Sequence, residues 1–256
     1  MIIRAILLST AFFLVAGQAN AALILNAALP ITERVTVNLI DVANTNGSSP
    51  APVFGNAAQQ AAILANIDAI WAQAGIDIQI NFRPGTYNNS FANFGTAAPA
   101  DRPQSDLNSI VNTAQLAGGV LDPNPNVLNL FVVNIVPGFS QTSANTANGL
   151  AIVGGNGITA WAGPALVSFP AGQEVIASVF AHEIGHNLGL NHIVAAENLM
   201  QAGGSPNLGE RLNAAQIAAA LASPFSVAVP EPSATALILV SMGIVGFNRI
   251  RRRKAA

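Results

Sequence analysis

The sequence has no cysteine, and its 256 residues include only one lysine, one tyrosine and three histidines. Without cysteine the chain has no disulfide framework, no cysteine-type zinc site and no cysteine nucleophile. Charged residues are also scarce, at 9%, whereas hydrophobic residues make up 51%. This apolar content excludes a disordered or fibrous chain. The formal net charge of −2 gives no electrostatic basis for binding nucleic acid.

The first 21 residues, MIIRAILLSTAFFLVAGQANA, have the pattern of an export signal. Arg4 gives a positively charged start, an apolar stretch follows as far as Gly17, and Ala19-Asn20-Ala21 matches the small-x-small pattern at which signal peptidase cleaves. We therefore expect residues 1–21 to be a signal peptide that is removed during export. A buried N-terminal helix is the alternative.

Residues 229–256 combine three ordered features: Pro230-Glu231-Pro232, an apolar stretch over residues 234–247, and a basic end of four arginines and one lysine. The stretch is short for a spanning helix, which needs about 20 residues, but the basic end favours a membrane anchor with a cytoplasmic C-terminus. The three features together resemble the PEP-CTERM sorting signal of Gram-negative bacteria. The resemblance implies transient membrane anchoring, recognition by an exosortase-type processing enzyme, and a place in the cell envelope or outside the cell. A plain tail anchor is the alternative.

The region between the two ends is acidic, because four arginines face eleven acidic residues, a net charge of −7. We expect it to be a single soluble domain over residues 22–228. Hydrophobic patterns predict strands at residues 34–40, 76–82, 127–136, 150–153 and 158–161, and helices at residues 57–74, from 105, from 173 to Gly189, and 213–221. Pro84 and Gly85 are expected to end the second strand, and Ser105 to cap a helix. This order predicts an α/β fold with a mixed sheet.

All three histidines fall in one segment, His182-Glu-Ile-Gly-His186-Asn-Leu-Gly-Leu-Asn-His192. His182 and His186 are four residues apart, so on a helix they share one face and can reach one zinc ion at about 2.0–2.1 Å. Gly189 lies where the helix must end, and a positive φ there would turn the chain and bring His192 back as a third ligand. Three protein ligands with one open position describe a catalytic zinc site.

Glu183, directly after the first histidine, is suited to act as general base on a zinc-activated water. A structural zinc site has no use for a carboxylate at this position, so Glu183 favours hydrolysis of peptide bonds. The alternative is a non-enzymatic envelope or matrix surface protein with a structural or vestigial zinc site. Calcium stays unknown, because the aspartates are scattered and form no calcium-loop motif.

The full pattern HExxHxxGxxH resembles the zinc signature of the metzincin clan of metalloendopeptidases, and with residues 149–155 it looks most like the reprolysin (adamalysin-like) branch. Reprolysins usually have aspartate after the third histidine, where this chain has Ile193, so the subfamily stays open. The resemblance implies one catalytic zinc ion, a protein or peptide substrate, and a zincin-like α/β (α+β) fold. That fold has a mixed five-stranded sheet, an active-site helix and a smaller C-terminal subdomain with a Met-turn. It also implies a Met-turn methionine at Met200 and an edge strand that aligns the substrate at Leu150, Ala151, Ile152 and Val153.

Overall fold

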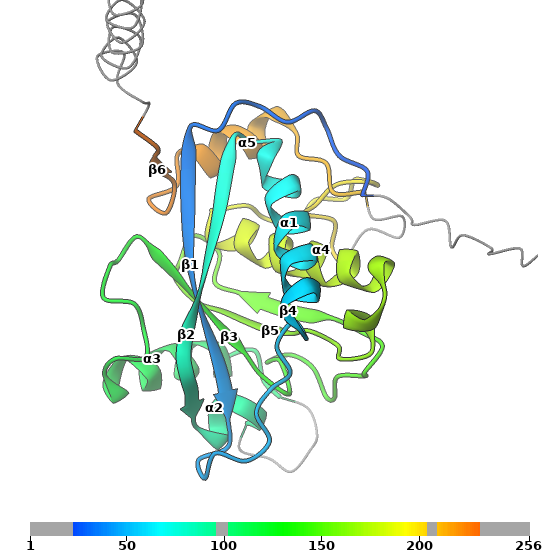
Figure 1. Ribbon diagram of the computed structural model, residues 1–256. Coiled ribbons are helices and arrows are strands. Elements are labelled where there is room, and N and C mark those ends of the chain that lie inside the picture. The colour runs from blue at the N-terminus through cyan, green and yellow to red at the C-terminus, as the bar shows by residue number, and fades with distance from the viewer. Residues whose placement is uncertain (1–22, 96–101, 204–208, 231–256) are drawn as a thin grey trace, which may run out of the picture.

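The computed structural model describes residues 23–95, 102–203 and 209–230 (Figure 1). The expected signal peptide lies outside the described residues, as do Glu231, Pro232 and the apolar and basic parts of the expected sorting signal. Within the described ranges, no helix is both long enough and apolar enough to cross a membrane.

The described strands form one mixed sheet. The strands and α-helices of the described ranges are, in chain order, β1 (Glu33–Ala43), α1 (Ala57–Ala72), β2 (Ile76–Asn88), α2 (Ser90–Phe94), α3 (Asp106–Ala117), β3 (Val127–Val132), β4 (Asn148–Ala151), β5 (Ile158–Trp161), α4 (Pro170–Asn187), α5 (Ala214–Leu221) and β6 (Val227–Ala228). The sheet order is β2-β1-β3-β5-β4, with β6 pairing to β1. Neighbours along this path are parallel except β4, which is antiparallel to β5, and β6 is antiparallel to β1. The predicted mixed five-stranded sheet is confirmed, and the two-residue strand β6 is added to it.

Helices cover both faces of this sheet (Figure 1). Side chains alternate along β1, so Val37 and Leu39 point into one core with α1 and α4, whereas Ile40 and Val42 point into a second core with α2 and α3. Both cores are built from side chains that are almost entirely buried. His182 and His186 lie on α4, a helix that packs against the larger of the two cores.

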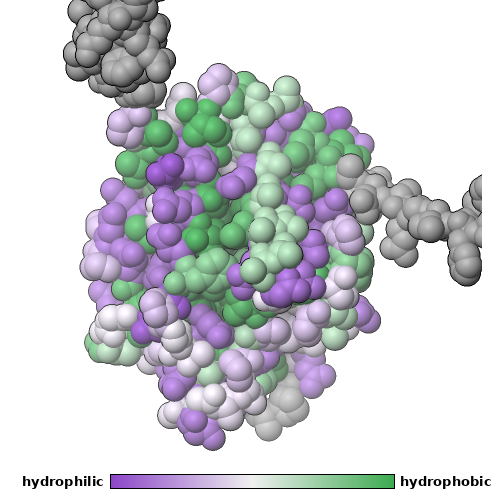
Figure 2. Space-filling model, in the orientation of Figure 1, coloured by the Kyte–Doolittle hydropathy of each residue, from purple (hydrophilic) through white to green (hydrophobic). Residues whose placement is uncertain are grey.

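α1 shows how sequence sets a local element. Its N-terminus is closed by a capping box, in which the Asn56 side chain accepts from the backbone N–H groups of Ala58 and Gln59, and Gln59 accepts from the Asn56 N–H. Its solvent-exposed positions 57, 58, 61, 65 and 69 are all alanine. In the space-filling view this outer side is a pale green, weakly hydrophobic band (Figure 2). The predicted helix over this segment is confirmed.

Several local predictions differ from the structure. The strand predicted over residues 127–136 ends at Val132 as β3. β2 continues past Pro84 and Gly85 to Asn88, because the register shifts between Leu39 and Asp41 of β1 and the extra residues of β2 form a bulge. Ser105 does not cap α3, because its own backbone is helical and its side chain makes no cap hydrogen bond.

Candidate metal centre

The turn after α4 has the geometry expected at Gly189. This residue has a φ of +93°. The N–H of Gly189 donates to the carbonyl of His186 (2.9 Å), and the N–H of Leu190 donates to the carbonyl of Gly185 (2.9 Å). This pair of bonds is a Schellman motif, which ends a helix by sharply reversing the chain. The reversal brings His192 back toward α4.

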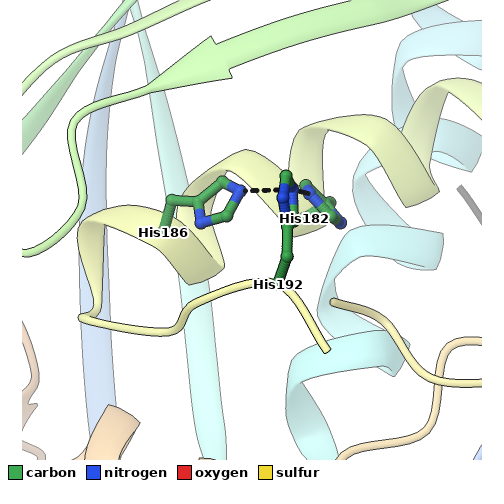
Figure 3. A group of neighbouring side chains, drawn as sticks. All are labelled: His182, His186 and His192. Atoms are coloured by element: carbon green, nitrogen blue, oxygen red, sulfur yellow. Dashed lines mark hydrogen bonds between the residues drawn. The ribbon is translucent and has the colours of Figure 1, made fainter. Parts of the chain in front are cut away.

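The three histidine side chains converge on one point (Figure 3). His182 and His186 project from α4, and His192 reaches them from the segment after the turn. Nε2 of His192 lies 3.1 Å from Nε2 of His182 and 3.1 Å from Nε2 of His186. The structure thus brings together the three residues that the sequence predicts as ligands.

Backbone carbonyls fix the orientation of two of these rings. Nδ1 of His182 lies 2.6 Å from the carbonyl oxygen of Leu199, and Nδ1 of His186 lies 2.7 Å from that of Leu190. A carbonyl only accepts, so each Nδ1 carries the proton and donates it, which leaves a lone pair on each Nε2. Burial lowers the pKa of His182 to about 4 and also lowers the pKa of His186. Burial therefore favours the neutral form of both rings, which is the form that binds metal.

These residues fit a zinc ion. A proton on Nε2 of His192 could be donated to only one of its two neighbours at 3.1 Å, whereas a cation at the centre would be contacted by the lone pairs of all three Nε2 atoms. The spacing is close to the separation of about 3.3 Å between ligand atoms that lie 2.0–2.1 Å from a tetrahedral zinc. Among the described residues, His182, His186 and His192 are the group whose ligand atoms lie close enough together, within 4.8 Å, to hold a metal ion.

Glu183 lies beside this cluster and is 6% exposed. Burial raises the pKa of its carboxyl group to about 8. Its Oε2 atom is buried and has no hydrogen-bond partner within the described part of the chain. The Glu183 side chain also packs against Gly149 of β4. A Cβ atom added at Gly149 would collide with this side chain and lie 2.7 Å from its Cδ and Oε1 atoms. The edge strand thus approaches the carboxylate as closely as a glycine permits.

Met200 is fully buried and packs against α4. A Cβ atom added at Gly185, the residue before His186, would lie 2.7 Å from the Met200 Sδ atom. The turn that holds Met200 is tied to α5, because Asn198 accepts from the Met200 N–H and exchanges two hydrogen bonds with Gln216. Met200 therefore lies where a Met-turn residue is expected, and its supporting role stays a prediction.

The site opens into a cleft of about 800 Å³. Its described lining consists of the three histidines and Glu183, with Gln104, Pro137, Gly138, Phe139, Ala147, Asn148, Gly149, Leu150, Ala151, Val153, Ser178, Val179, Asn191 and Gly203. Apart from the histidines and Glu183, this described lining has no ionisable side chain. Phe139 and Val153 are apolar, yet 36% and 48% exposed.

β4 forms one edge of the sheet, because β5 is its only partner strand in the described part of the chain. The observed strand, Asn148–Ala151, begins earlier than the predicted one and also ends earlier. Leu150 and Ala151 lie in the strand, whereas Ile152 and Val153 lie in the turn that follows, which closes through a bond from the Ile152 N–H to the Gly157 carbonyl. Alignment of a substrate by this edge stays a prediction.

Some residues near the site were not found from the sequence. Ser178, one turn before His182, donates to Glu210 Oε1 across 2.6 Å, and burial raises the pKa of Glu210 to about 7. The two residues are 32 positions apart, so no local pattern links them. Gly185 does carry a signal, because glycine inside a helix costs about 1 kcal/mol relative to alanine and indicates a close approach.

We compared the chain with known protein families, curated proteins and solved structures. The sequence matches the family described as metallo-peptidase family M12B, reprolysin-like, over residues 19–193. No curated protein matches the chain. Solved structures with a similar fold include metalloproteinase-II from Bacteroides fragilis, with 16% sequence identity, a TM-score of 0.45 and coverage of 75% of this chain. This chain spans only 56% of that protein.

Two archaemetzincins are also similar in structure. The one from Methanopyrus kandleri is 12% identical, with a TM-score of 0.48 over 74% of this chain and 93% of its own. The one from Archaeoglobus fulgidus, complexed with malonate, is 15% identical, with a TM-score of 0.43 over 73% of this chain and 99% of its own.

The family match extends over more than half of the chain and contains the whole segment from His182 to His192. The chain therefore belongs to the reprolysin-like metallopeptidases of family M12B.

Proposed function

We propose that this protein is a zinc-dependent endopeptidase. The observation that carries the proposal is the convergence of three histidines, with Nε2 of His192 3.1 Å from Nε2 of each of the other two, in a cleft that also holds the Glu183 carboxyl group and its unpartnered Oε2 atom. A zinc ion bound there supplies a Lewis acid that polarises a peptide carbonyl and acidifies water. The residues around it supply orientation and proton transfer.

Glu183 acts as the general base. Burial alone raises the pKa of this carboxyl group, but the positive charge of a zinc ion held by the adjacent histidines would lower it and favour the ionised form that a base needs. The Oε2 atom would then be free to accept a proton from the attacking water, and the same carboxyl group could deliver that proton to the leaving nitrogen. Because Glu183 follows His182 on α4, one rigid helix sets the positions of both. Gly149 supports this role, since its lack of a side chain makes room for the carboxylate between α4 and β4.

The cleft accepts an extended peptide with apolar side chains. The free edge of β4 offers backbone N–H and C=O groups with which such a peptide can pair. Phe139 and Val153 expose apolar surface inside the same cleft, and its described lining has no arginine or lysine to attract acidic side chains. These features support uncharged, partly hydrophobic protein segments as substrates.

The protein acts in the cell envelope or outside the cell. Residues 1–21 are the signal peptide, residues 22–228 the metalloprotease domain and residues 229–256 a PEP-CTERM sorting signal that an exosortase-type enzyme processes. The support for this is the sequence pattern at the two ends. Location is tested by fractionating cells that express the chain with and without residues 229–256.

Activity is tested on the purified protein with a library of peptides, before and after a chelator. Wild type should bind zinc at 1:1 and cleave peptides, and Glu183→Gln should lower kcat by about 100-fold or more with zinc retained. Glu174→Gln is the matched control, because Glu174 is on the same helix but does not line the cleft. Cleavage that survives the chelator, or full activity of Glu183→Gln, contradicts the proposal. Bound zinc without any cleavage favours the non-enzymatic alternative.

A further inference from the structure

We propose that Asn187 is a positioning residue that holds the substrate-aligning end of β4 at a fixed place relative to the metal-binding helix. Asn187 is the last residue of α4, directly after His186, and is fully buried. The inference rests on the proposed endopeptidase function, because it concerns how the peptide is placed rather than how the bond is broken.

The side-chain amide of Asn187 joins α4 to the β4–β5 turn, defined here as residues 152–157. Its Nδ2 donates to the carbonyl oxygen of Ile152 at 2.7 Å and to that of Gly157 at 3.3 Å. A third bond runs the other way, from the N–H of Gly154 to the carbonyl of His186 at 2.8 Å. The turn is thus bonded to the helix at its start, its middle and its end.

This connection matters because, within the described ranges, β4 has a neighbouring strand on one side only. β4 contains Gly149, which packs against Glu183, and the turn after β4 contains Val153, which lines the cleft. The bonds to α4 therefore set the distance between a peptide paired to β4 and the histidine cluster. A displacement of about 1 Å at this kind of contact can lower a reaction rate by as much as about 100-fold.

Neither helix formation nor core packing accounts for an asparagine at this position. Asparagine is a poor helix former, and the Oδ1 atom of Asn187 is buried without a hydrogen-bond partner among the described residues. A buried unpaired acceptor destabilises the folded state, and an apolar side chain of similar size would avoid this cost. The two donors on Nδ2 are the feature of Asn187 that such a side chain lacks.

Asn187→Leu in the full-length protein is the first test variant. The carbonyl of Ile152 keeps its bond from the Gly155 N–H, and the carbonyl of Gly157 keeps its bond from the Ile152 N–H. The substitution therefore removes two of the three bonds to α4 without leaving either carbonyl unpaired, and the backbone bond from Gly154 to His186 remains. Asn187→Ser is a milder variant for use if leucine prevents folding.

Asn156→Leu is the matched control. Asn156 lies in the same turn, but its Nδ2 donates to the carbonyl of Val127 at 2.6 Å and so ties the turn to β3 instead of α4. Zinc content, kcat and KM are measured for all variants on nested peptides that contain one cleavage site and extend by steps from two residues to eight.

We expect Asn187→Leu to bind zinc at 1:1 and to cleave the shortest peptide about as fast as wild type. Its kcat/KM on the longest peptide should fall by about 10-fold or more, because the gain that wild type draws from pairing with β4 is lost. In Asn156→Leu any loss of kcat/KM should be of equal size at every peptide length. A loss in Asn187→Leu that is equal at all lengths, or no loss, overturns the inference while wild-type cleavage still supports the proposed function. A wild-type protein that binds zinc and cleaves nothing overturns both.

Discussion

The Met200 sulfur lies against Gly185 so closely that a Cβ atom at this glycine would be 2.7 Å from it. Gly185→Ala should therefore lower the free energy of unfolding by about 1–3 kcal/mol, although alanine is the better helix former. The steric conflict should also weaken zinc binding, because Gly185 immediately precedes His186. Urea denaturation and zinc titration measure the two effects.

Met200→Ala in the Gly185→Ala background is the control for this prediction. Shortening the methionine makes room for the new methyl group, so the two substitutions should be less destabilising together than the sum of their separate effects. Strict additivity would show that the close contact is not the cause.

Gly149 and Glu183 give a prediction about catalysis. In Gly149→Ala the new methyl group collides with the Glu183 side chain and displaces the carboxylate. We expect kcat to fall by about 100-fold, in the range that a general base contributes, with the zinc content unchanged because the three histidines are not touched. Metal analysis and steady-state kinetics on one peptide check both parts, and unchanged kcat would contradict the assigned role of Glu183.

Glu210 makes stability depend on pH. Burial raises its pKa from 4.5 to about 7, so the folded protein holds this proton more tightly than the unfolded chain. Its contribution to stability is complete below about pH 4.5 and is lost as the pH rises through about 7. Glu210→Gln keeps an acceptor for Ser178 without titrating, and should lose less stability than wild type between these pH values, by on the order of 3 kcal/mol.

Urea denaturation over a pH series tests this dependence. Glu197→Gln is the control, because Glu197 lies on the surface, in an ion pair with Arg211 at 2.8 Å. This variant shows the effect of removing an acidic group from the surface instead of a buried one. A stability curve for Glu210→Gln that runs parallel to that of wild type would refute the prediction.

Phe139 gives a prediction about substrate selection. Replacing it by serine removes apolar surface from the cleft, so the preference for hydrophobic over polar peptides should fall by about 10-fold, the discrimination that burial of part of an apolar side chain gives. Phe169→Ser is the control, because Phe169 is similarly exposed, at 41% against 36%, but does not line the cleft. Cleavage profiles of a peptide library distinguish the two variants, and equal changes would contradict a role in selection.

The parts of the site that the sequence predicts well are those set by local spacing. His182 and His186 share a helix face because they are four residues apart. Gly189 turns the chain because glycine, unlike other residue types, adopts a positive φ at little cost. Contacts between segments far apart in the sequence were not predicted, such as Gly149 of β4 against Glu183 of α4 and Ser178 of α4 with Glu210, since their spacing follows no period. Pro84 and Gly85 do not end β2, because they lie in a bulge of that strand. The bulge depends on how β2 pairs with β1, and the local sequence does not show this pairing.

Strand β6 has a mechanical consequence. Val227 and Ala228 pair with Arg34 and Glu33, and the N–H of Val229 donates to the carbonyl of Thr32 at 2.9 Å. Everything that follows residue 230 is therefore joined to the domain at the start of β1, an interior strand of the sheet. A pull on the C-terminal end of the chain acts first on these few hydrogen bonds and only after they break on α5, the helix that precedes β6. Because α5 is bonded to the turn that holds Met200, the contacts between β6 and β1 shield that turn from tension on a tethered C-terminal end.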